Sequence, residues 1–267
     1  MKLRTLLCAG ALTLALTAPA SALTLKVDGV DLTEQAGAHI YRGTTYVSLR
    51  TVSELLDDSA QVSWNGRSAG VSTDQVEITA TIGARYIALS NGKCLYIPNG
   101  VRLVEGRTMV PVRTLAAALG GEVAWDGETS TVSLTTGDGA PQPAAYNQED
   151  LYWLSRIISA ESRGEPLEGK LAVGTVVLNR VASSQFPNTI KGVIFDRKWG
   201  VQFTPVANGA VYDDPTEESV LAAKLVLEGA RAAGDSLYFF APALTDDRWI
   251  PNHRTYVTTI GCHQFYR

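Results

Sequence analysis

The sequence predicts an α+β protein, with a small two-repeat α+β module first and a mainly helical domain with a small β-ribbon after it. Two observations lead to this prediction. An internal repeat runs through the first half of the 267-residue chain. In the second half, three segments space their apolar residues as helices do, and short alternating segments typical of strands follow them.

The composition is that of a globular protein. It has 45% hydrophobic and 19% charged residues, with 24 Gly and 11 Pro, which excludes disorder, collagen and coiled coil. The length suits about two domains. A formal net charge of −4 argues against a nucleic-acid partner, because such proteins present a basic footprint.

Residues 1–22 have the layout of a secretory signal peptide. Lys2 and Arg4 precede an apolar stretch over 6–18, and small residues at 20–22 form a cleavage site. The alternative is a retained N-terminal anchor. We expect a secreted chain with no transmembrane segment after cleavage. Cleavage would leave Cys94 and Cys262, either as one interdomain disulfide or as two unpaired, mostly buried thiols.

The repeat has an offset of 63 positions, which falls to 61 after a two-residue difference in length. Matched pairs include Gly43 with Gly106, Thr45 with Thr108, Val47 with Val110, Arg50 with Arg113, and Trp64 with Trp125. In each copy, the order of elements is a hairpin, a short helix and a second hairpin.

Turn signals and apolar spacing locate these elements. Asp28-Gly29 and Asn91-Gly92 each separate two alternating runs and predict type I′ hairpins. The short helices cover 49–56 and 112–119. The second hairpins turn at Asn65-Gly66 and Asp126-Gly127, just after the matched tryptophans.

Region 23–136 resembles the copper-amine-oxidase N-terminal-like domain, on the segment EGRTMVPVRTLAAALGGEVAWDG over 105–127. The first copy departs from that pattern, with Ser48 where the pattern has Pro. The resemblance implies a non-catalytic stalk or wall-associated domain, so this module is expected to bind cell wall or protein. Arg50 and Arg113 could bind an anionic glycan, but their matched positions favour a structural role between strand and helix. Residues 137–146, rich in Gly, Pro and Ala, predict a linker.

The domain predicted over 147–267 opens with a helix that carries a candidate acid. Asn147 is its predicted N-cap, and its apolar stripe includes Leu154 and Ile158. Glu161 lies seven residues beyond Leu154, on the same face and near the helix end. Burial and the negative end of the helix dipole both disfavour a charged carboxylate there, as a general acid requires. A solvated glutamate at a frayed helix end is the alternative.

Further helices and strands follow. The second helix covers 166–182, with Glu168 in its first turn as a capping acid. Residues 183–215 predict a long irregular stretch with aromatic residues suited to sugars or to core packing. The third helix starts with Asp214 as N-cap and Pro215 as its first residue, and ends near Gly234. Segments 236–242 and 258–267 predict strands.

The blocks ISAESRGEPLEGKLAVGTVVLNRV (158–181), QFTPV (202–206), SLYFFAP (236–242) and IGCHQFY (260–266) resemble the SleB/CwlJ-type cell-wall hydrolases, the spore-cortex-lytic enzymes. The resemblance implies a lysozyme-like, goose-type fold and cleavage of peptidoglycan glycan strands as a lytic transglycosylase, at the cell wall or spore envelope. It makes Glu161 the catalytic residue. Gln202, Phe203, Tyr238, Ser162 and His263 are the predicted substrate-binding residues.

The implied reaction needs one carboxyl group and neither metal nor cofactor. Glu161 would protonate the oxygen between N-acetylmuramic acid and N-acetylglucosamine, and then accept the proton of the C6 hydroxyl that attacks C1, giving a 1,6-anhydro product.

Three alternatives remain open. A hydrolytic muramidase would need a second acid such as Glu165, Asp196 or Asp213. A zinc amidase would have to use His253, Cys262 and His263, which lack the paired ligand spacing of such enzymes. A non-catalytic wall-binding protein is the third alternative.

Overall fold

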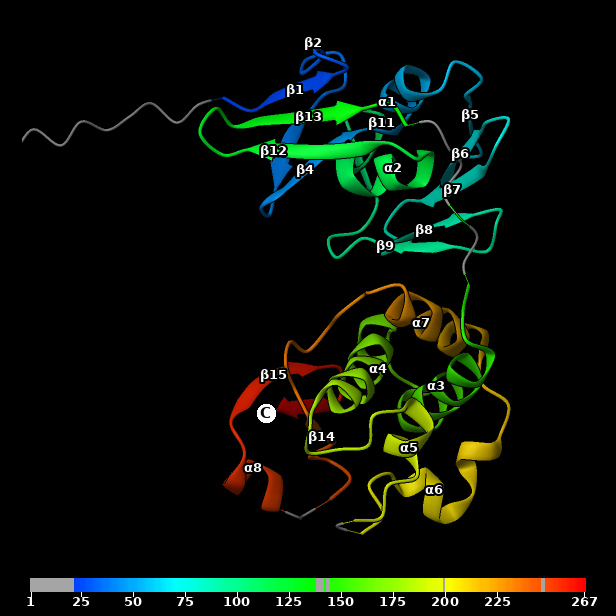
Figure 1. Ribbon diagram of the computed structural model, residues 1–267, viewed down its shortest axis with the longest axis vertical. Coiled ribbons are helices and arrows are strands. Elements are labelled where there is room, and N and C mark those ends of the chain that lie inside the picture. The colour runs from blue at the N-terminus through cyan, green and yellow to red at the C-terminus, as the bar shows by residue number, and fades with distance from the viewer. Residues whose placement is uncertain (1–21, 138–141, 143–144, 199, 246–247) are drawn as a thin grey trace, which may run out of the picture.

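The computed structural model describes residues 22–137, 142, 145–198, 200–245 and 248–267. The predicted signal peptide, except for its last residue, and six of the ten residues of the predicted linker lie outside these residues. The chain forms a β-rich part and a helical part, which lie one above the other in Figure 1. This arrangement confirms the predicted α+β class. None of the helices within the described ranges is long and apolar enough to cross a membrane.

The β-rich part contains three sheets and two short helices. Their strand orders are β12-β13-β1-β2, β10-β11-β4-β3 and β5-β6-β7-β8-β9. The strands are β1 Thr24–Val27, β2 Val30–Asp31, β3 His39–Tyr41, β4 Thr44–Ser48, β5 Gln61–Trp64, β6 Ser68–Ser72, β7 Glu77–Thr81, β8 Tyr86–Leu89, β9 Cys94–Tyr96, β10 Arg102–Val104, β11 Arg107–Pro111, β12 Glu122–Asp126 and β13 Thr131–Thr135. The helices are α1 Leu49–Leu56 and α2 Val112–Leu119, as predicted.

The two repeat copies pair through equivalent strands. Strand β4 lies antiparallel to β11, with Val47 directly opposite its repeat partner Val110. Equivalent residues facing one another across an antiparallel pair indicate a local two-fold relation between the copies. Both valines are fully buried in one core shared by the copies. The Tyr46 hydroxyl adds a buried polar link by donating to the Gly100 carbonyl oxygen at 2.9 Å.

The two type I′ predictions have different outcomes. Asp28 and Gly29 both have positive φ, +47° and +85°, as this turn requires. At the equivalent turn only Gly92 has positive φ, and the Gly92 N–H bonds the Leu89 carbonyl. The second prediction is therefore wrong: four residues, 90–93, join β8 to β9, so the connection is longer than a two-residue turn.

The helical part packs α3, α4, α5 and α7 around one apolar core and carries a three-stranded sheet of order β14-β16-β15. Its elements are α3 Gln148–Ser162, α4 Leu167–Ala182, α5 Ile190–Ile194, α6 Thr204–Asn208, the 3-10 helix η1 Ala210–Tyr212, α7 Glu217–Leu227, β14 Tyr238–Phe240, α8 Trp249–His253, β15 Tyr256–Ile260 and β16 His263–Tyr266. Asn147 caps α3 as predicted, its side chain accepting from two backbone N–H groups.

Three predictions for this half are corrected. The stretch 183–215 contains α5, α6 and η1, which are too short to give a periodic signal. Helix α7 is capped by Thr216, whose hydroxyl accepts from the Ser219 N–H at 3.2 Å, because Asp214 instead accepts from Arg156 at 2.8 Å. It ends at Leu227, before Gly229 with φ of +99°. The predicted β-ribbon is confirmed: β15 and β16 form a hairpin that turns at Gly261, and β16 pairs with β14.

Strands β8 and β9 pack against the helical part. Tyr86, Cys94 and Tyr96 contact its apolar core. Two ion pairs flank this contact, Arg85 with Glu168 at 3.1 Å and Lys93 with Glu228 at 3.6 Å. Cys94 and Cys262 are both free thiols. Cys94 is half-buried, whereas Cys262 is exposed, contrary to the expectation that both are mostly buried.

We expect Tyr46→Phe to lower the free energy of unfolding by about 1–2 kcal/mol, because the buried Gly100 carbonyl would lose its donor. Urea denaturation measures the change. Tyr212→Phe, at a tyrosine that is 58% exposed, is the control and should leave stability unchanged. Equal stability of Tyr46→Phe and the unaltered protein would show that this bond does not join the copies.

Candidate active site

A cavity of about 480 Å³ opens beside the C-terminal end of α3. Helix α4, the segment entering α6, strand β14 and the start of β16 supply its other walls. The described lining residues that bear on chemistry are Glu161, Arg180, Gln202, Phe203, Phe239, Thr245 and His263.

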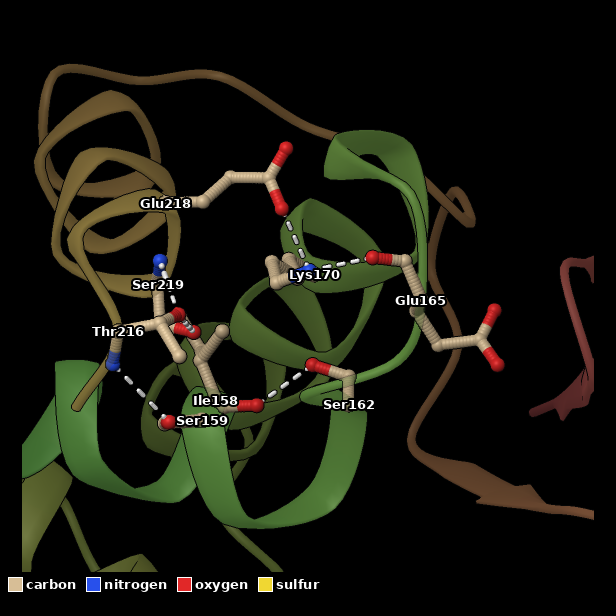
Figure 2. Close-up of polar contacts among 8 residues, drawn as sticks. All are labelled: Ile158, Ser159, Ser162, Glu165, Lys170, Thr216, Glu218 and Ser219. Carbon is tan, nitrogen blue, oxygen red and sulfur yellow. Dashed lines mark hydrogen bonds and ion pairs between the residues drawn. The ribbon is translucent and has the colours of Figure 1, made fainter.

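Helical spacing turns Glu161 toward the cavity. Leu154, Ile157 and Ile158 are fully buried against the core, and Glu161 continues their face. The end of the helix is held by hydroxyl groups, as Figure 2 shows: Ser162 donates to the Ile158 carbonyl at 2.5 Å, and Ser159 accepts from the Thr216 N–H at 3.2 Å. The backbone carrying Glu161 is therefore fixed on both sides.

The environment of Glu161 favours its protonated form. Burial raises the pKa of Glu161 to about 7, and the positive charge of Arg180 offsets part of that increase. The acid is therefore close to half protonated near neutral pH, the range in which a general acid is most effective. Among the described residues that line the cavity, no other carboxyl group is present.

Arg180 is a site residue that sequence reasoning missed. It is buried, and its Nε donates to the Leu237 carbonyl at 2.7 Å. Its guanidinium carbon lies 4.9 Å from the Phe186 ring centre and 5.1 Å from that of Phe203. Nη1 is buried with no hydrogen-bond partner in the protein, which leaves its two N–H groups for a ligand. The only signal in the sequence is its place on α4, one turn beyond the buried Val176.

His263 lines the cavity, and Glu165 lies beside His263 but outside the cavity lining. The Glu165 carboxylate accepts from the Cys262 N–H at 3.1 and 3.3 Å, and its Oε1 lies 3.9 Å from Nδ1 of His263. Burial lowers the pKa of His263, although the Glu165 charge opposes the change. Figure 2 shows the Glu165 backbone carbonyl accepting from Lys170, which also pairs with Glu218 at 2.7 Å.

The structure brings together four of the six predicted site residues. Gln202, Phe203 and His263 line the same cavity as Glu161. Ser162 does not line it, because its hydroxyl is turned back to the helix. Tyr238 is also outside the lining, and its hydroxyl accepts from Arg254 at 3.1 Å. Tyr238 instead supports Arg180, whose guanidinium carbon is 5.7 Å from its ring centre.

The residues that the muramidase and amidase alternatives would need are not grouped in the cavity. Glu165, Asp196 and Asp213 do not line the cavity. His253 is part of α8 and bonds the Trp249 carbonyl through Nδ1 at 2.8 Å, away from the cavity lining. Within the part of the chain that the structure describes, no three His, Cys, Asp or Glu side chains are placed to share a metal ion.

Known proteins match both halves of the chain. Residues 164–266 match the cell wall hydrolase family model, and residues 26–134 match the copper amine oxidase N-terminal domain. The cell wall hydrolase CwlJ of Oceanobacillus iheyensis is 32% identical over 103 residues, covering 36% of this chain and 72% of that protein. The chain belongs to the cell wall hydrolase family.

Other members of the family are also similar. A spore cortex-lytic enzyme of Bacillus cereus is 39% identical over 127 residues, covering 48% of each chain. The one from Bacillus subtilis is 36% identical over 126 residues, covering 47% of this chain and 40% of that enzyme. The chain thus spans about half the length of these relatives. The solved catalytic domain of the germination-specific lytic transglycosylase SleB from Bacillus anthracis is 39% identical, covers 47% of this chain and 100% of that domain, and gives a TM-score of 0.42.

We expect Glu161→Gln to stabilise the protein at pH 8 by roughly 2–3 kcal/mol and to change little at pH 4. The unfolded carboxyl ionises near its ordinary pKa of 4.5 and the folded one only near 7, so ionising the folded group costs stability as pH rises between these values. Thermal unfolding across this pH range measures the effect. Glu34→Gln, at an exposed position, is the control. A gain that did not vary with pH would contradict the assigned burial.

Proposed function

We propose that this family member is a secreted lytic transglycosylase of peptidoglycan, acting on the cell wall or spore envelope. The observation that carries the proposal is one carboxyl group with a pKa near 7, in a cavity whose described lining holds no second acid. The similar proteins are spore cortex-lytic enzymes and a germination-specific lytic transglycosylase, which supports the same class of reaction.

In the proposed reaction, protonated Glu161 donates to the glycosidic oxygen between N-acetylmuramic acid and N-acetylglucosamine. The bond to C1 breaks and positive charge develops on the muramyl ring. Ionised Glu161 then accepts the proton of the C6 hydroxyl as that oxygen bonds C1, which closes the 1,6-anhydro ring. Because the nucleophile belongs to the substrate, no second carboxylate is needed to activate water.

The other residues of the cavity have binding roles in this proposal. Gln202 and the unpartnered Nη1 of Arg180 offer donors to sugar hydroxyl, acetamide or carboxylate groups. Phe239 provides apolar surface for the sugar rings, with His263 beside it at a ring-centre distance of 5.3 Å. Phe203 is only 2% exposed and packs in the helical core, so it supports the cavity wall and does not stack on a sugar. A neutral His263 can donate or accept a hydrogen bond without repelling Arg180.

Product mass tests the reaction class directly. Digestion of purified peptidoglycan should release anhydro muropeptides, each one water lighter than the hydrolysed form, and Glu161→Gln should reduce release by at least about 10²-fold. Asp213→Asn and Glu165→Gln are the matched controls, since a hydrolytic muramidase would need a second acid and would yield hydrolysed ends. Hydrolysed ends from the unaltered protein would overturn the transglycosylase assignment.

The rate of release should fall with increasing pH, with an apparent pKa of about 7, because the first step consumes the proton of Glu161. Above that value, the rate should drop about tenfold per pH unit. Removing the positive charge in Arg180→Met should move this limb to higher pH, since Arg180 lowers the pKa of Glu161. Rates of release measured between pH 5 and 9, with circular dichroism to confirm folding, test this prediction. A rate that did not change with pH would contradict the role of Glu161 as the general acid.

A further inference from the structure

We propose that the β-rich part carries two equivalent binding grooves for the anionic glycan strand of peptidoglycan, each built on an exposed tryptophan and an arginine. Only the choice of ligand rests on the proposed function. The first groove, of about 280 Å³, is lined by Trp125, Arg113, Val123, Ile40 and Thr45. The second, of about 420 Å³, is lined by Trp64, Arg50, Val62, Leu103 and Thr108.

The two grooves correspond residue by residue through the repeat. Trp125 corresponds to Trp64, and Arg113 to Arg50. Ile40 and Thr45 correspond to Leu103 and Thr108 at the offset of 63. Each groove takes its tryptophan, arginine and valine from one copy and its larger aliphatic residue and threonine from the other, as expected if the local two-fold relation duplicates a single site.

The need to fold explains why the two copies share buried residues, but it does not explain why they also share the exposed residues of the grooves. The valines that pair β4 with β11 are fully buried, so core packing accounts for them. In contrast, Trp64 and Trp125 are 47% and 46% exposed, and Leu103 and Ile40 are 53% and 55% exposed. Large apolar side chains that stay exposed beside polar groups mark interaction surfaces. Here the same surface is present twice.

The chemistry of each groove suits an acidic sugar polymer. The apolar face of a sugar ring can stack on an indole, and threonine hydroxyls can bond sugar hydroxyls. The arginines provide positive charge for the carboxylates of the peptide stems, and none of the described lining residues of either groove is acidic. Arg50 is engaged in the fold, donating to the Val62 carbonyl at 3.2 Å and pairing with Glu54 at 3.4 Å, so Arg113 is the cleaner probe of charge.

A repeating polymer also fits the placement of the grooves. One groove includes Thr44 and Thr45 at the start of β4, and the other includes Ser48 at its end. Thr44 and Ser48 are four residues apart, which along an extended strand is about 13 Å. Binding of one strand at two such sites raises the apparent affinity without any new contact.

The test is cosedimentation of the full chain with insoluble peptidoglycan, carrying Glu161→Gln so that the polymer is not digested. Trp64→Ala and Trp125→Ala should each weaken binding at least about fivefold, and the double variant more than either. Leu55→Ala is the control, because Leu55 is 39% exposed on α1 and lines neither groove. Trp125→Phe should recover part of the loss if ring stacking is responsible.

Arg113→Gln separates the contribution of charge to the affinity from the contribution of ring stacking. It should weaken binding to peptidoglycan at low salt at least about threefold and leave binding to uncharged chitin unchanged. Muropeptide release, measured on soluble glycan fragments with Glu161 intact, should stay within twofold in both tryptophan variants. Unchanged cosedimentation of the double variant, or an equal loss of binding in Leu55→Ala, would overturn the proposal that the grooves bind peptidoglycan. Absence of release from the unaltered protein would instead overturn the proposed reaction.

Discussion

The helical part holds one half-buried carboxyl group, that of Glu161, beside the cavity at the end of α3. That position is unfavourable for an ionised group, since burial raises its pKa to about 7 and the C-terminal end of a helix is itself negative. The rest of the helix offsets this unfavourable free energy, because Leu154, Ile157 and Ile158 are fully buried and Asn147 caps the other end. Any rotation of α3 that exposed Glu161 would also expose that apolar stripe.

Arg180 is the buried, positively charged residue that lines the same cavity as Glu161. A buried guanidinium near a buried acid could hold that acid ionised, yet burial dominates the pKa of Glu161. Arg180 is itself desolvated, which lowers its pKa to about 10, and its Nε is committed to the Leu237 carbonyl. The positive charge therefore limits the rise in the pKa of Glu161 while Nη1 remains for a ligand. The Leu237 carbonyl and the ring of Tyr238, at the start of β14, hold this arginine beside the cavity.

Periodicity and repetition predicted much of this structure. The helices α1, α2, α3 and α4 follow from apolar spacing, and the repeat predicted a short helix in each copy. The predicted cap of α7 was wrong because another contact competes for it. Asp214 bonds Arg156, and Thr216 caps the helix instead. The cavity was only partly predictable. Glu161 could be inferred from its face, but the grouping of Arg180 with Gln202 and His263 depends on how three segments pack, which spacing along one chain does not record.

The contact between the two parts gives the repeat module a fixed place relative to the cavity. Strands β8 and β9 contact α7 and the helical core, and the ion pair of Arg85 with Glu168 joins them to the first turn of α4. The same helix carries Arg180 near its other end. The grooves use neither β8 nor β9, so the surface that docks the module and the surface that would bind glycan are separate. A polymer bound in the grooves would therefore not compete with the docking contact.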